Sequence, residues 1–312
     1  MKKSWHFSNY PALSSLFVFL VIFSINVYLQ PRVLTYRVLY SNLSTFTPLV
    51  LVAMSQAVVI LSGNIDLSTG AMLSLLNVVM ATLFQNTLGS VLAGIIIAFA
   101  IALLGGMVNG YFVGYLRLPP IVTTFATAFV WSGIALLIMP QPGGHVPKWL
   151  YRLFQSGRLQ FPLPLFLIVV ALLIWWLTVR KPLGRKIYAV GGNRISSVLS
   201  GIDHRQVILM TYMLSSFFLA LAAVALTGLV ASGDARVGTP VTLTSIAAVA
   251  IGGNSLRGGR GGVIGPMLGA ILLFFISNII LLVGVPSLYQ DFIKGTIIVG
   301  AIGLAVLTQY RR

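Results

Sequence analysis

The chain has 312 residues, of which 58% are hydrophobic and only 8% charged, and its formal net charge is +16. A soluble globular domain carries about a quarter charged residues, so this chain cannot build a soluble surface. It also has no cysteine, which excludes disulfides and thiolate chemistry. The basic residues lie in loops between apolar runs, as membrane topology predicts, so their excess does not indicate nucleic-acid binding. Lipid is the solvent that fits this composition.

A membrane-spanning helix needs about 20 mostly apolar residues, and the apolar runs predict about ten spans. One run, at 242–252, is too short to cross as a straight helix. We expect an all-α polytopic membrane protein in which residues 1–312 form one transmembrane domain. The predicted spans are residues 12–29, 47–62, 71–86, 89–113, 118–139, 163–179, 207–230, 242–252, 263–283 and 291–308.

The loop at 180–206 has six basic residues and one acidic residue, Asp203. By the positive-inside rule this loop is cytoplasmic, and the even number of spans before and after it predicts that both termini are cytoplasmic too. The basic residues at 140–161 fall on the outer side and conflict mildly with this topology. The 180–206 loop is denser in basic residues and closer to the helix ends, so it determines the predicted topology.

Two apolar runs end in glycine-rich polar breaks, GNIDLSTG at 63–70 and GGNSLRGG at 252–259. Each break is followed by a new apolar helix. Interrupted hydrophobic segments at matching places in two halves are typical of transporters built from internal repeats. The chain contains no Walker A sequence, so any nucleotide-driven work must come from another polypeptide.

Four ordered stretches across residues 47–305 carry a recognisable pattern: GNIDLSTG (63–70), GGMVNGYFVGYLRLPPIVTTFAT (105–127), GRKIYAVGGNRISSVLSGID (184–203) and IAAVAIGGNSLRGGRGGVIGPMLGA (246–270). Together they resemble the membrane permeases of ribose, xylose, arabinose and galactose-type ABC importers. The chain departs from that family's pattern at Thr242-Leu243-Thr244, where carboxylates are common, at Asn254, where Thr is usual, and at Pro266, where Thr is common.

The resemblance implies a permease subunit that moves a sugar or sugar-like solute across the inner membrane. It also implies a separate ATPase subunit, a periplasmic solute-binding protein and a second permease subunit, identical or related. The chain itself is then no enzyme and needs no cofactor or metal. Alternatives are a permease for branched-chain amino acids or nucleosides, an ion-coupled transporter or channel, and a structural scaffold. An ion-coupled carrier needs intramembrane charge, for which Asp66, Asp291 and Lys294 are the candidates.

Within the 180–206 loop, Asn193 is a good N-cap for a short helix, and two glycines before it allow a sharp turn. This helix would carry its apolar residues on one side. The resemblance implies that it docks into a groove of the ATPase subunit; the alternative is a surface loop that only fixes topology. The coupling residues are Gly191, Gly192, Asn193, Arg194, Ile195, Ser196, Ser197, Val198, Leu199 and Gly201, the last placed to end the helix.

Asp66 is the one acidic residue within the membrane region of the first half. Intramembrane carboxylates are costly and usually functional, so Asp66 is a candidate for the solute path. Gln56, Asn64 and Asn109 are further candidates because their amides can bind solute hydroxyls. Asp66 could instead cap the helix that begins near Leu67, and the two roles could coexist.

Overall fold

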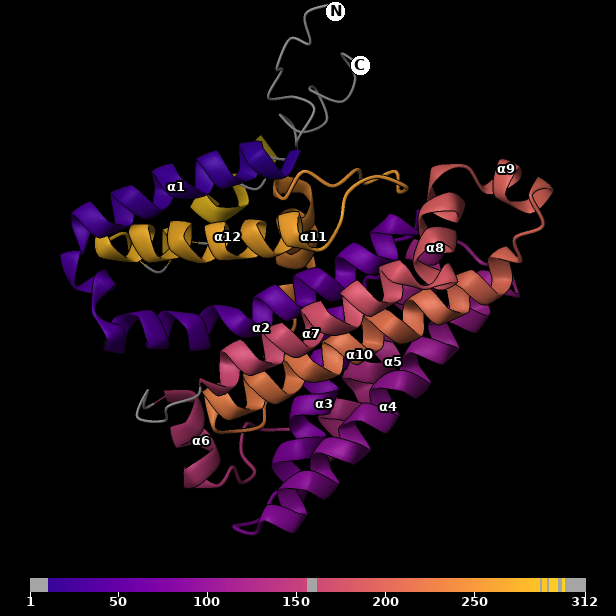
Figure 1. Ribbon diagram of the computed structural model, residues 1–312. Helices are drawn as coiled ribbons and strands as arrows, with labels where there is room; N and C mark the ends of the chain where they lie inside the picture. Colours follow the sequence, from indigo (N-terminus) through magenta and orange to yellow (C-terminus); the bar gives the residue numbers. More distant parts are fainter. Residues whose placement is uncertain (1–10, 156–161, 287, 291, 297–298, 301–312) are drawn as a thin grey trace, which may run out of the picture.

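The computed structural model describes residues 11–155, 162–286, 288–290, 292–296 and 299–300. Every regular element in these residues is a helix, so the predicted all-α class is confirmed (Figure 1). The elements are α1 (Pro11–Leu29), η2 (Pro31–Leu34), α2 (Tyr36–Leu61), α3 (Thr69–Leu83), α4 (Leu88–Gly114), α5 (Pro120–Ile138), α6 (Lys148–Gln155), α7 (Leu163–Arg180), α8 (Pro182–Gly192), α9 (Arg194–Leu199), α10 (His204–Val230), α11 (Val241–Ile251) and α12 (Ile264–Leu282).

Six of the described helices are long and apolar enough to cross a membrane: α2, α4, α5, α7, α10 and α12. Shorter apolar helices lie within α1 and at α3 and α11. Nine of the ten predicted spans therefore coincide with a helix. The tenth, 291–308, falls mostly outside the described residues.

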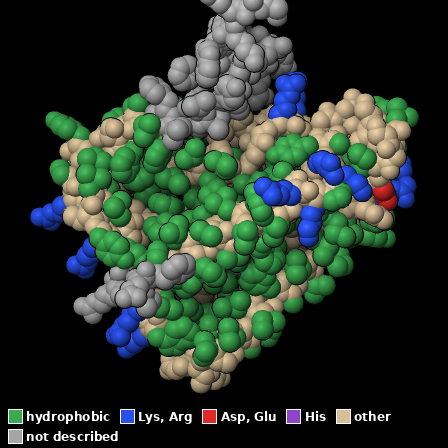
Figure 2. Space-filling model, viewed as in Figure 1, with side chains coloured by type: hydrophobic (Ala, Val, Ile, Leu, Met, Phe, Trp, Pro, Cys, Tyr) green, Lys and Arg blue, Asp and Glu red, His purple; other side chains and the backbone are tan. Residues whose placement is uncertain are grey.

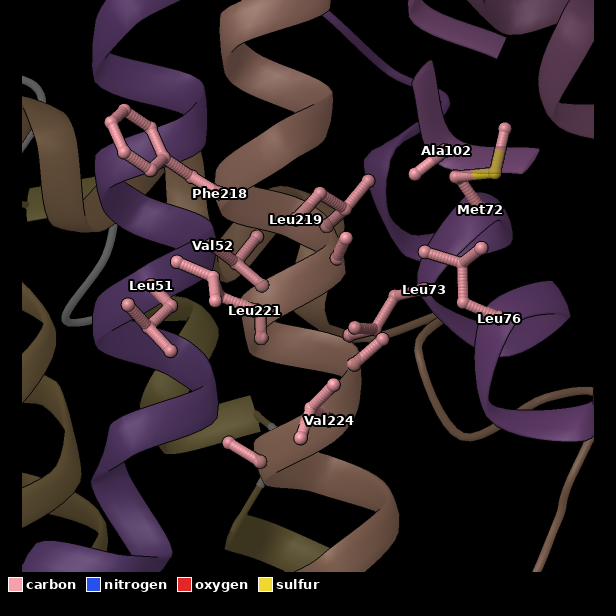
Figure 3. Packing of buried hydrophobic residues seen from close by; sticks show 14 of the residues in the cluster. Leu51, Val52, Met72, Leu73, Leu76, Ala102, Phe218, Leu219, Leu221 and Val224 are labelled. Atoms are coloured by element: carbon pink, nitrogen blue, oxygen red, sulfur yellow. The ribbon is translucent and has the colours of Figure 1, made fainter. Parts of the chain in front are cut away.

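The protein core lies around α10, which packs against both α2 and α4. Figure 3 shows buried side chains of α10 together with those of α2 and α3. Phe218, Leu219 and Leu221 of α10 belong to one buried cluster with side chains of α2, α3 and α4. The α4 glycines allow a close approach, because a Cβ added at Gly106 would lie 2.3 Å from the Ser216 hydroxyl oxygen. Small residues at helix contacts are the usual basis of packing within membranes.

Helix α2 begins at Tyr36, although the sequence predicted its span only from residue 47. In the polar stretch before that point, hydroxyl groups bond to carbonyl oxygens one turn earlier, so they are satisfied within the helix. Thr45 donates to the Ser41 carbonyl over 2.8 Å, for example. Tyr40 and Ser44 also donate to carbonyl groups of α6, so polar residues that look like a loop in the sequence anchor this half of the helix.

Helices α2 and α11 end in the same way, so the two predicted breaks begin with the same backbone conformation. Gly63 and Gly253 have positive φ angles of 80° and 81°. The next backbone N–H, of Asn64 or Asn254, donates back to Val59 or Val249, over 3.2 and 3.3 Å. This pattern is the Schellman motif, in which the residue in the left-handed conformation is usually glycine because it has no Cβ.

Hydrophobic side chains cover most of the face shown in Figure 2, and basic side chains gather toward its two ends. Figure 1 places α8 and α9 at one of these ends and α6 far from them. Helix α1 packs along α12, where the rings of Phe23 and Phe275 lie 5.3 Å apart in an edge-on arrangement. The apolar flanks suit a lipid environment.

Candidate functional site

The predicted short helix in the 180–206 loop exists as α9 and is capped at both ends. The side-chain oxygen of Asn193 accepts a hydrogen bond from the backbone N–H of Ser196 over 3.0 Å, as the N-cap prediction requires. Gly201, with a φ of 77°, follows the last turn, and its N–H donates to the Val198 carbonyl over 2.9 Å. Asn193 and Gly201 therefore fix where α9 begins and ends.

The apolar residues of α9 point away from the protein. Ile195 is 75% exposed, Val198 47% and Leu199 84%. They line a groove together with three basic side chains, Arg117, Arg194 and His204. An apolar surface with a basic rim is typical of a protein–protein contact. Five of its six residues lie outside the helices that could span the membrane, and the sixth, His204, is the first residue of α10. We call these six groove residues the α9 surface.

Arg117 and His204 belong to the α9 surface although sequence reasoning did not select them. Arg117 lies in the connection between α4 and α5 and has a positive φ of 57°. The predicted topology has an even number of spans before residue 117 and before the 180–206 loop, so it predicts that both lie on the same side of the membrane. This shared side was the signal in the sequence that could have indicated a common surface.

Gly191 and Gly192 do not form the sharp turn that the sequence predicted, because both lie in the last turn of α8. The chain changes direction instead at Asn193, whose backbone is extended with a φ of −157°. One helix therefore leads directly into the next, with a single extended residue between them. Ser197 is buried on the inner side of α9.

The candidate solute-path residues lie in a different part of the protein, where α2 gives way to α3. Asp66 is buried, and one of its carboxylate oxygens accepts hydrogen bonds from the N–H and O–H of Ser68 over 2.8 and 2.6 Å. Asn109 of α4 donates to the Ser68 hydroxyl over 2.9 Å. The amide oxygen of Asn109 accepts from Thr127 of α5 over 2.8 Å. A buried hydrogen-bonded chain thus joins the break to two further helices.

Gln56 of α2 belongs to the same network and is fully buried. With its amide oriented to satisfy both partners, it donates to the Asp66 carbonyl over 3.1 Å and accepts from the Asp66 N–H over 3.3 Å. Asn64 is different, because its amide bonds locally to the Ser62 hydroxyl over 2.9 Å. The fold therefore brings together Gln56, Asp66 and Asn109, and Asn64 shapes the end of α2.

Residues 38–302 match the family described as branched-chain amino acid transport system / permease component. The chain belongs to this permease family. Among curated proteins, the permease is 34% identical to the ribose import permease protein RbsC of Bacillus subtilis over 81% of the chain and 79% of the relative. It is 32% identical to RbsC of Escherichia coli over 96% and 93%.

Other relatives are named as permeases for different solutes. The D-allose transport system permease protein AlsC of Escherichia coli is 32% identical over 82% of the chain and 79% of the relative. The autoinducer 2 import system permease protein LsrC of Salmonella choleraesuis is 31% identical over 88% and 79%. No solved structure matches the chain. The predicted resemblance to sugar-type ABC permeases is confirmed.

Proposed function

We propose that this permease moves a sugar or sugar-like solute across the cell inner membrane, and that an ATPase subunit docks on the α9 surface to drive it. The observation that carries the docking proposal is the exposure of Ile195, Val198 and Leu199 on a capped helix. Exposed apolar side chains outside the membrane are costly unless a partner covers them. An ATPase groove with apolar walls and acidic groups would complement them and the basic rim.

Co-purification of the ATPase subunit with single variants tests this docking. Val198→Glu places a carboxylate in the groove and should weaken the association by about 2 kcal/mol, roughly thirtyfold. Ser196→Glu is the matched control, because Ser196 is exposed, does not line the groove and lies in the first turn of α9. A carboxylate is favourable there. Equal retention of the ATPase by both variants would falsify the docking site.

The solute proposal rests on the relatives, whose names are those of ribose, D-allose and autoinducer 2 import permeases. A periplasmic solute-binding protein and a second permease subunit complete the proposed importer, and ATP hydrolysis occurs on the ATPase. Uptake of labelled D-ribose and D-allose, compared with leucine and a nucleoside in a strain lacking the permease, tests the solute class. Restoration of leucine uptake alone would favour an amino-acid permease.

We also propose that α9 and both termini face the cytoplasm. Support comes from the basic residues at this end of the protein, which include Arg117, Arg194 and Arg205 on neighbouring segments. Positive charge is retained on the cytoplasmic side during insertion.

The solute-path role of Gln56, Asn64, Asp66 and Asn109 stays a prediction. Three of these residues share one buried network at a helix break, and such breaks form the solute sites of many transporters. In this arrangement the carboxylate of Asp66 is held at the start of α3 while the network ties the break to α4 and α5. Substitution of Asp66 by Asn with separate measurements of uptake and stability tests the two roles.

A further inference from the structure

Three segments that lie far apart in the sequence meet beside the α9 surface. They are the C-terminal end of α2, the last turn of α8 and the loop between α11 and α12. Figure 1 shows this loop reaching from α11 toward α8, next to the end of α2. The end of α2 and the α11–α12 loop belong to the two helix breaks, one in each half of the chain. The last turn of α8 leads directly into α9.

The three segments touch through their backbones. The N–H of Gly259 donates to the Leu61 carbonyl over 3.0 Å. A Cβ added at Gly191 would lie only 1.9 Å from that carbonyl oxygen and 2.9 Å from the Gly259 nitrogen. A Cβ added at Gly258 would lie 2.7 Å from the Cα of Gly63. We call these five residues, Leu61, Gly63, Gly191, Gly258 and Gly259, the glycine junction.

Two side chains hold the α11–α12 loop in this position. The Tyr188 hydroxyl of α8 donates to the Gly261 carbonyl over 2.9 Å. The amide of Asn254 closes the loop on itself, donating to the Gly262 carbonyl over 2.8 Å and accepting from the Gly262 N–H over 3.1 Å. The loop is therefore a closed unit attached to α8 by a hydrogen bond as well as by packing.

We propose that Tyr188 and Gly191 are positioning residues that carry a displacement of α9 into both helix breaks at once. The inference rests on the proposed docking of an ATPase on α9. One extended residue, Asn193, separates α9 from α8, so a push on α9 moves the last turn of α8. Backbone atoms in direct contact cannot absorb that movement by side-chain rotation, as close-packed protein transmits strain. The ends of α2 and α11 must then shift together.

Neighbouring glycines provide a matched pair of variants. Gly191→Ala places its methyl group on the Leu61 carbonyl and must force the junction apart. Gly192→Ala adds the same methyl group one residue later, where the nearest atom is the Gly259 Cα at 4.0 Å. Although the sequence predicted Gly192 as a coupling residue, it lies in α8 and does not line the α9 surface, so this variant leaves the docking residues unchanged. Tyr188→Phe is a milder variant, which keeps the ring and removes only the hydrogen bond to Gly261.

The reporter is a single cysteine at Arg260, an exposed residue of the loop in a chain without natural cysteines. Maleimide labelling of Arg260→Cys is followed in the complex with the ATPase subunit, without nucleotide and with ATP and vanadate. We expect a nucleotide-dependent change in labelling rate in the parent and in Gly192→Ala. The change should be lost in Gly191→Ala and reduced in Tyr188→Phe, while both variants still co-purify with the ATPase.

An unchanged nucleotide response in Gly191→Ala overturns the role of the glycine junction and leaves docking intact. If Gly191→Ala does not insert into the membrane, Tyr188→Phe decides: a reduced response supports the proposal and a parental response overturns it. Failure of the parent to retain the ATPase contradicts docking itself, and with it this inference. The two failures are thus distinguishable.

Discussion

The backbone N–H of Gly259 donates a hydrogen bond to the carbonyl oxygen of Leu61 over 3.0 Å. Gly259 lies in the α11–α12 loop, which is the second helix break, and Leu61 is the last residue of α2, directly before the first break. The last carbonyl groups of a helix have no hydrogen-bond donor within that helix, so the Gly259 N–H supplies a donor for the terminal carbonyl group of α2. The two halves of the protein are in this way connected by backbone next to the proposed ATPase contact. Movement at one break should therefore be felt at the other.

The cap of α9 can be tested independently of its apolar residues. Asn193→Ala removes the side-chain oxygen that accepts from the Ser196 N–H and should destabilise this short helix by about 1 kcal/mol. We expect roughly fivefold weaker binding of the ATPase subunit, measured by titration in detergent. Asn193→Asp keeps the acceptor and should bind like the parent. Equal binding of the alanine and aspartate variants would contradict the importance of the cap.

The buried polar network should contribute to stability. Asn109→Ala removes bonds to Ser68 and Thr127 and leaves a small cavity, which should cost about 1–2 kcal/mol. The measurement is the thermal unfolding midpoint of the purified permease in detergent. Thr45→Ala serves as the control, since the exposed Thr45 hydroxyl bonds only to its own helix at Ser41. An Asn109→Ala midpoint as high as that of the control would argue against the network.

The α11–α12 loop should depend on Asn254, which bonds both backbone groups of Gly262 from a buried position. Asn254→Ala leaves these groups without their partner and should loosen the loop. We expect faster hydrogen exchange across residues 255–262, with little change in α3 or α4. The Schellman turn at Gly253 uses backbone groups only, so protection at the end of α11 should persist. Exchange that is unchanged in the loop would contradict the role of Asn254.

The proposed topology predicts opposite labelling of two exposed positions. Ser200→Cys, at the end of α9, should react with a membrane-impermeant maleimide only after cells are opened. Gln141→Cys, in the connection between α5 and α6, should react in intact spheroplasts. The absence of natural cysteines removes background labelling. The reverse pattern would invert the topology and place α9 outside the cell.

Much of the helical plan was visible in the sequence because apolar runs and capping residues act locally. Asn193 and Gly201 were predicted to bound α9, and they do so through short-range hydrogen bonds. The early start of α2 was missed because Tyr40 and Ser44 find their partners in α6, which no local pattern reveals.

The sites show the same division between local and distant effects. The sequence drew attention to Gly191 as part of a turn, but its real constraint is contact with Leu61 and Gly259. Arg117 joined the α9 surface only when the fold brought its loop beside α9. Contacts between distant segments depend on how the helices pack, and one sequence does not encode that packing in any readable local signal.

The most direct test of the proposed function is a pull-down of the permease from detergent, scored for an associated ATPase subunit. It compares the native chain with a variant in which residues 193–201 are replaced by a Gly/Ser linker. We predict that the native chain retains the ATPase and that the linker variant loses it while remaining in the membrane. Retention of the ATPase by the linker variant, or its absence from both, would contradict the assignment of α9 as the coupling element.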